Sequence, residues 1–167
     1  MNAQQSLWWN QVRSDYQVLL LLRKNDVEPC HQLHYLQMVT EKLGKAYFWR
    51  GGHPPPRSHV SFVKFLQAID DRKKSDRSRI PALFGFGAAA FEGCIRAITP
   101  VAYDLERLAP SLAGEGPNPE YPWPSSLPIY APSSYKFKVW LKLVESVPGR
   151  RLLQVIDVAV REFPKFA

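Results

Sequence analysis

The stretch that decides the fold is residues 30–46, which read CHQLHYLQMVTEKLGKA. Apolar residues return every three or four positions along it and just beyond, a spacing that places them on one face of a helix; they are Leu33, Leu36, Val39, Leu43, Ala46 and Tyr47. Pro29 suits the first helical turn, where its missing N–H would have no partner. The sequence therefore predicts a helix from about Pro29 to Trp49, ended by the glycines and prolines of residues 51–56.

Four further segments have helical spacing. They are residues 7–23, with Trp8, Val12, Tyr16, Leu19 and Leu20; a segment capped by Ser58, with Phe62, Val63, Leu66 and Ile69; residues 84–105; and a last helix capped by Ser146 and lined by Leu152, Ile156, Val160 and Phe163. Pro100 predicts a kink or short break near Ile98. Gly85, Gly87 and Gly93 are interpreted as points of close helix contact.

Two segments are less regular. Residues 110–132 contain seven prolines, and we expect an ordered loop that packs across the bundle through Tyr121, Trp123, Ile129 and Tyr130. Residues 136–145 fit both a strand and a helix, and helix is preferred because a lone strand would have no partner. The prediction is one all-α domain over residues 1–167, an up-and-down bundle of about five helices with a long proline-rich loop.

Composition narrows the class of protein. The longest apolar run, residues 18–22, is far shorter than the roughly 20 residues of a membrane span, so no membrane association is expected. Cys30 and Cys94 lie in helical segments without a secretory signal before them, which predicts unpaired, buried thiols and a cytoplasmic location.

Positive charge is concentrated in two parts of this chain of net charge +7. One is the polar run that ends the third helix, with Arg72, Lys73, Lys74, Arg77 and Arg79. The other is the C-terminal segment, with Lys136, Lys138, Lys142, Arg150 and Arg151. Such a cluster can neutralise backbone phosphates, which predicts RNA or DNA as a partner, although solubilising charge explains it almost as well.

The central helix also carries a family pattern. Gln37, then Glu41-Lys42, then Lys45-Ala46, followed by Ser58-His59, resembles the second and third helices of HEPN domains, and Asp15 stands where such proteins often have an acidic residue. The resemblance covers roughly residues 7–70. It implies a helical bundle, a homodimer and a setting in defence or toxin–antitoxin systems, and it makes Glu41, Lys42, Lys45 and His59 candidate binding residues. The alternative for the first three is a solvated face on which Glu41 pairs with Lys45 one turn away.

Active HEPN proteins use an arginine followed four to six residues later by a histidine. The windows before His31, His34, His53 and His59 contain no arginine. We therefore predict no catalytic residue and no cofactor, with a diverged ribonuclease or toxin as the alternative. A metal site is not predicted either, because Cys30, His34, His59 and Cys94 offer zinc-type ligands without a closely spaced cysteine pair. A protein that binds nucleic acid or a protein partner is the leading hypothesis, and a structural subunit of a larger complex is a further alternative.

Overall fold

The computed structural model describes residues 1–52, 60–72 and 79–166. These residues form an all-α helical bundle with no β-strand, as predicted. The α-helices are α1 (Ala3–Lys24), α2 (Pro29–Phe48), α3 (Ser61–Arg72), α4 (Arg79–Leu83), α5 (Ala88–Glu106), α6 (Pro110–Ala113), α7 (Lys138–Glu145) and α8 (Val147–Glu162). Short 3-10 turns lie at Trp49–Gly51, Pro132–Ser134 and Phe163–Lys165.

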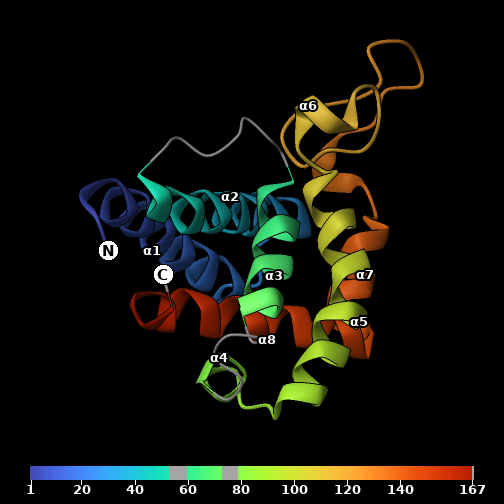
Figure 1. Cartoon of the computed structure of the whole chain (residues 1–167). Helices are drawn as coiled ribbons and strands as arrows, with labels where there is room; N and C mark the ends of the chain where they lie inside the picture. The colour runs from blue at the N-terminus through green and yellow to red at the C-terminus, as the bar shows by residue number, and fades with distance from the viewer. Residues whose placement is uncertain (53–59, 73–78, 167) are drawn as a thin grey trace.

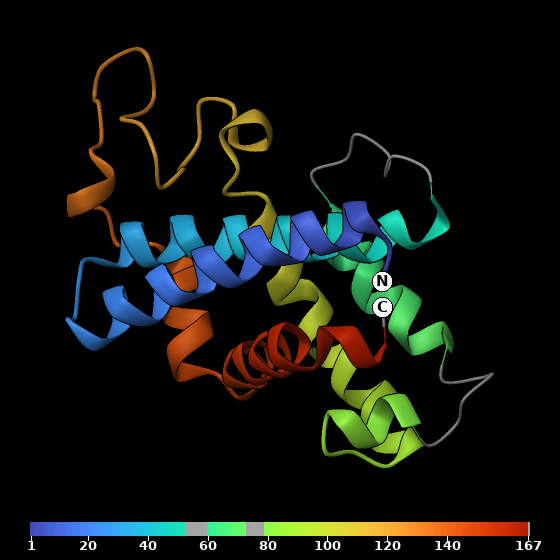
Figure 2. The same ribbon diagram turned by 90° about the vertical axis from the view of Figure 1, so that its left-hand side faces the viewer.

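Helices α1 and α2 lie side by side as an antiparallel hairpin in both ribbon views (Figures 1 and 2). Helix α3 packs on α2, α5 packs on α3, and α8 packs on α5 and closes against α1. The two chain ends lie close together, whereas α6 and the proline-rich segment project beyond the helices at one end (Figure 2).

The predicted apolar stripes supply most of the core. Every residue of the α2 stripe is buried, and Val12, Leu19, Phe62, Ile156 and Phe163 join it in one cluster. The inclusion of Leu20 in the α1 stripe was wrong, because Leu20 is 47% exposed. Burial of such side chains stabilises the fold by about 25 cal/mol for each Å² of apolar surface removed from water.

Helices α2 and α3 touch backbone to backbone at Gly44. A Cβ added there would lie 2.5 Å from the carbonyl carbon of Ser61. The close helix contacts are therefore at Gly44 and, between α7 and α8, at Gly149. The prediction for Gly85, Gly87 and Gly93 was wrong, because a Cβ at these three positions would meet nothing within 4 Å.

The predicted fourth helix, residues 84–105, corresponds to α5 but starts too early, because residues 84–87 form the turn between the separate helix α4 and α5. Helix α4 ends in a turn in which the Phe86 N–H bonds the Pro81 carbonyl at 2.9 Å and the Gly85 N–H bonds the Ala82 carbonyl at 3.0 Å. Gly85 has φ +76°, the left-handed conformation that ends helices in this motif. Helix α5 then runs from Ala88 through Pro100 to Glu106 without the break expected near Ile98.

Residues 138–145 are helical, which confirms the preference for a helix over a strand. Val139 and Leu143 are buried on this helix, whereas Leu141 is 45% exposed. Helix α8 begins as predicted: the Ser146 hydroxyl accepts the Gly149 N–H at 3.0 Å and caps the helix.

The proline-rich segment is ordered, as predicted. The buried Asn118 side chain accepts the N–H groups of Glu120 and Tyr121 at 3.0 and 2.8 Å, and the backbones of Trp123 and Tyr130 pair in an antiparallel bridge. Only Trp123 packs inward; Tyr121, Ile129 and Tyr130 are exposed, so these three do not clamp the bundle as expected. The segment leaves the bundle instead of crossing it.

Candidate functional site

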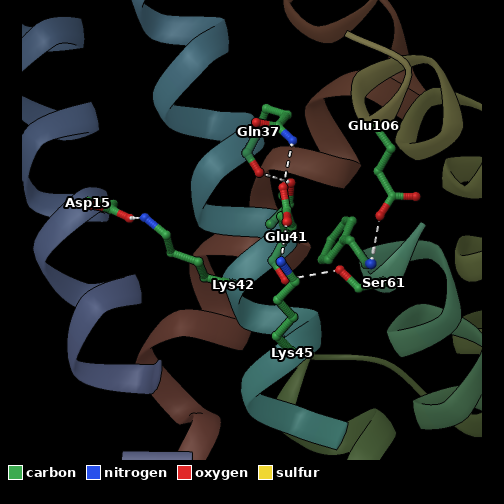
Figure 3. Close-up of polar contacts among 9 residues, drawn as sticks. Asp15, Gln37, Glu41, Lys42, Lys45, Ser61 and Glu106 are labelled. Carbon is green, nitrogen blue, oxygen red and sulfur yellow. Dashed lines mark hydrogen bonds and ion pairs between the residues drawn. The ribbon is translucent and has the colours of Figure 1, made fainter. Parts of the chain in front are cut away.

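The polar residues predicted on α2 lie where α1, α2 and α3 meet (Figure 3). Lys42 forms an ion pair of 2.5 Å with Asp15 of α1, and the Gln11 side chain donates a second hydrogen bond to that carboxylate at 2.9 Å. Asp15 is buried, so the lysine neutralises a charge that would otherwise be costly in the interior. Lys42 therefore holds α1 against α2.

Glu41 is the centre of a second group. Its carboxylate pairs with Lys45 and accepts the Gln37 amide N–H at 3.0 Å, while its backbone carbonyl accepts the Ser61 hydroxyl at 3.0 Å. The predicted i, i+4 pair is thus confirmed. Lys45 also lies 5.5 Å from the Trp8 ring, so this ammonium already has an anion and an aromatic face as partners.

The neighbouring carboxyl of Glu106 was not predicted from the sequence. It comes from α5 and accepts the Phe62 N–H at 2.7 Å and that of Val63, which satisfies two free donors at the start of α3. The side chain is 1% exposed, and Oε2 has no hydrogen-bond partner among the described residues. The pKa of this carboxyl is raised to about 7, chiefly by burial and further by the charge of Glu41, against the lowering effect of the hydrogen bonds from α3. Its only sequence signal is an acidic residue beside the apolar stripe of α5.

Most of the predicted basic cluster lies outside the described residues. The cluster residues outside them are Lys73, Lys74 and Arg77. The candidate binding residue His59 also lies outside them. Arg72 is the last residue of α3, and Arg79 is exposed at the first position of α4.

His34 connects α2 to the proline-rich segment. Its Nδ1 lies 3.5 Å from the Glu120 carboxylate, a distance that allows electrostatic attraction without a hydrogen bond, and its ring meets that of Tyr35 edge-on. Cys30 and Cys94 are free thiols, as predicted, but only Cys30 is fully buried and Cys94 is half-buried; burial raises the pKa of both. Residues 1–52, 60–72 and 79–166 contain no group of three or more histidine, cysteine or acidic side chains placed to hold a metal ion.

A cavity of about 550 Å³ opens at the base of the proline-rich segment, away from the predicted residues. Its walls are the end of α5, α6 and the first turn of α7, and they are mainly apolar, with Leu108, Leu112 and Val139 among them. Arg107 and Lys138 also line it. Sequence reasoning missed this site because its walls come from residues about 30 positions apart, on two helices joined by the proline-rich segment.

Comparison of the chain with models of known protein families, with curated proteins and with solved structures found no match. Among the described helices, none combines the length and hydropathy needed to cross a membrane. The class that fold and site define is thus an all-α bundle with a projecting, ordered proline-rich segment, and membership of the HEPN family stays a prediction from the sequence.

Proposed function

We propose that this protein is a non-catalytic, HEPN-like binding protein that docks a protein partner on the outer end of its proline-rich segment. The observation that supports this proposal is the set of exposed apolar side chains on that segment. Tyr121 is 58% exposed, Leu127 86%, Ile129 52% and Tyr130 47%. Apolar and aromatic side chains gathered on a projecting segment are typical of protein interfaces.

The segment is also held in shape before any partner arrives. The Trp123 ring packs edge-on against Tyr135 at 5.0 Å between ring centres, and the Ser125 hydroxyl donates to Glu115 at 3.1 Å across ten residues. A surface ordered in advance loses less conformational entropy on binding, so fewer contacts suffice for a stable complex.

The partner that fits this surface is a protein with an apolar patch bordered by acidic side chains. The chain has a net charge of +7, and the exposed residue Lys136 lies shortly after the segment. A second copy would bring two such charges together, which opposes the homodimer that the resemblance implies. Acidic groups on a different protein would instead increase the rate of association and its specificity.

Binding of RNA or DNA is the second candidate, favoured by the same net charge. Most of the basic cluster that predicts it lies outside the described residues, and two further candidate binding residues, Lys42 and Lys45, already have carboxylate partners within the fold. Cations already paired with carboxylates attract a phosphate only weakly, so the protein partner is the better-supported proposal.

The experiment is site-specific photo-crosslinking in the native host. A benzophenone amino acid replaces Leu127 in one strain and Leu7, which is 64% exposed on α1, in a control strain. We expect the Leu127 position to crosslink one acidic protein that the Leu7 position does not capture. Crosslinks at Leu127 to nucleic acid alone, to a second copy of this chain alone, or to the same set of proteins as at Leu7 would overturn the proposal.

A further inference from the structure

The cavity between α5, α6 and α7 has the size and lining of a small-molecule site. Its volume of about 550 Å³ lies within the range of roughly 300–1,000 Å³ that is usual for ligand pockets. Leu108 and Val139 form buried parts of its wall, and Leu112 lies half-exposed at its side. Such a lining favours a ligand with an apolar or aromatic body.

The charged residues of the cavity lining favour a ligand with a negative charge. Arg107 is the residue at which α5 ends, and Lys138 is the first residue of α7. No ion pair within the described ranges involves either of them, whereas nearby Lys142 is paired with Asp104 at 2.6 Å. Among the described residues, those that line the cavity include no acidic side chain. Two unpaired cations beside an apolar cavity provide charge-assisted hydrogen bonds for an anionic group.

Two tyrosines complete the polar part of the lining. Tyr103 is 38% exposed on α5, and Tyr135 lies on the other side at the base of the proline-rich segment. The Tyr135 ring packs edge-on against Trp123 and Phe137, which hold it in place. Aromatic side chains in the lining suit a flat ligand body.

We propose that this cavity binds a small amphipathic anion, with a flat apolar body seated between Leu108, Leu112 and Val139 and an acidic group bound by Arg107 and Lys138. The proposal does not depend on the protein partner, because it concerns the base of the proline-rich segment and not its exposed end. A ligand there would contact α5, α6 and α7 together.

Two fluorescent probes of the same shape test this proposal. Anilinonaphthalene sulfonate carries an aromatic body and one negative charge, and N-phenylnaphthylamine is the matching body without the charge. The folded protein should bind the sulfonate more tightly than the neutral probe. In the double variant Arg107→Gln, Lys138→Gln, affinity for the sulfonate should fall on the order of tenfold, with little change for the neutral probe. The control Lys24→Gln, Arg96→Gln removes the same charge from one exposed lysine and one exposed arginine outside the cavity and should leave both affinities unchanged.

Two further measurements locate the probe. Leu112→Trp adds bulk to a half-exposed wall position and should weaken both probes, with circular dichroism to verify the fold. Methyl NMR shifts on adding the sulfonate should concentrate at Leu108, Leu112 and Val139. Absence of sulfonate binding, equal affinity of the double variant, or shifts centred elsewhere would each overturn the proposal.

Discussion

Replacing Glu106 by glutamine should make the stability of the fold less sensitive to pH. The buried carboxyl has a pKa of about 7, above its ordinary value of 4.5. Because a pKa change of one pH unit corresponds to about 1.4 kcal/mol, the charged form loses about 3 kcal/mol on folding. The direction follows from linkage: this group's stabilising effect is fully present below about pH 4.5 and is lost as pH rises through about 7. Glutamine copies the shape of the protonated acid and keeps an oxygen for the Phe62 N–H.

The assay is urea unfolding of wild type and Glu106→Gln at several values between about pH 5 and pH 8. Integrating the linkage relation over this range, we expect the wild type to lose about 2.5 kcal/mol relative to the glutamine variant. Glu162→Gln serves as the control, because Glu162 pairs with Lys165 at a solvent-accessible site and should give no such divergence. A difference between wild type and Glu106→Gln that does not change with pH would refute the reasoning.

Three other predictions follow from the packing and from the motif analysis. Gly44→Ala should destabilise the fold by about 1–3 kcal/mol in urea unfolding, because its Cβ would meet the Ser61 backbone at 2.5 Å. Gly93→Ala, at an open helical position, should instead stabilise the fold by about 0.5–1 kcal/mol. Equal effects of the two substitutions would contradict the close contact at Gly44. Ser146→Ala should cost about 1 kcal/mol in the same measurement through loss of the α8 cap, and Ser134→Ala, which caps no α-helix, should cost less. Purified protein should leave labelled RNA intact with or without a chelator, and cleavage that survives the chelator and disappears in His59→Ala would show a catalytic protein.

Local signals in the sequence predicted the helices well. The α2 stripe is buried in full because its spacing, its proline start and its glycine and proline end all indicate the same helix. The start of α5 was misplaced at Phe84 although its signal was present: Gly85 ends α4 in the left-handed conformation and α5 begins only at Ala88, but Phe84 continues the apolar spacing of α5. The spacing of apolar residues alone does not show where one helix ends and the next begins.

Contacts between distant segments could not be predicted. Asp15 was singled out only through the family resemblance, and its pairing with Lys42 depends on how α1 and α2 pack. In the sequence, Glu106 resembles an exposed helix residue. Its role as acceptor for the free N–H groups at the start of α3 appears only when α3 and α5 are packed together. The Arg107 and Lys138 cavity exists only because the proline-rich segment returns the chain to the end of α5. In each case, residues far apart in the chain form the feature, and periodicity carries no information about their pairing.

The proposed binding surface is tested most directly by the affinity of the crosslinked partner, once purified, for variants of this chain. Isothermal titration would compare wild type, the double variant Leu127→Asp, Ile129→Asp, and the control Leu7→Asp, Leu21→Asp, whose positions are likewise exposed but lie on α1. Loss of two central apolar contacts should weaken binding by at least about tenfold, and the control should bind like wild type. Equal affinity of wild type and the Leu127, Ile129 double variant would contradict the account.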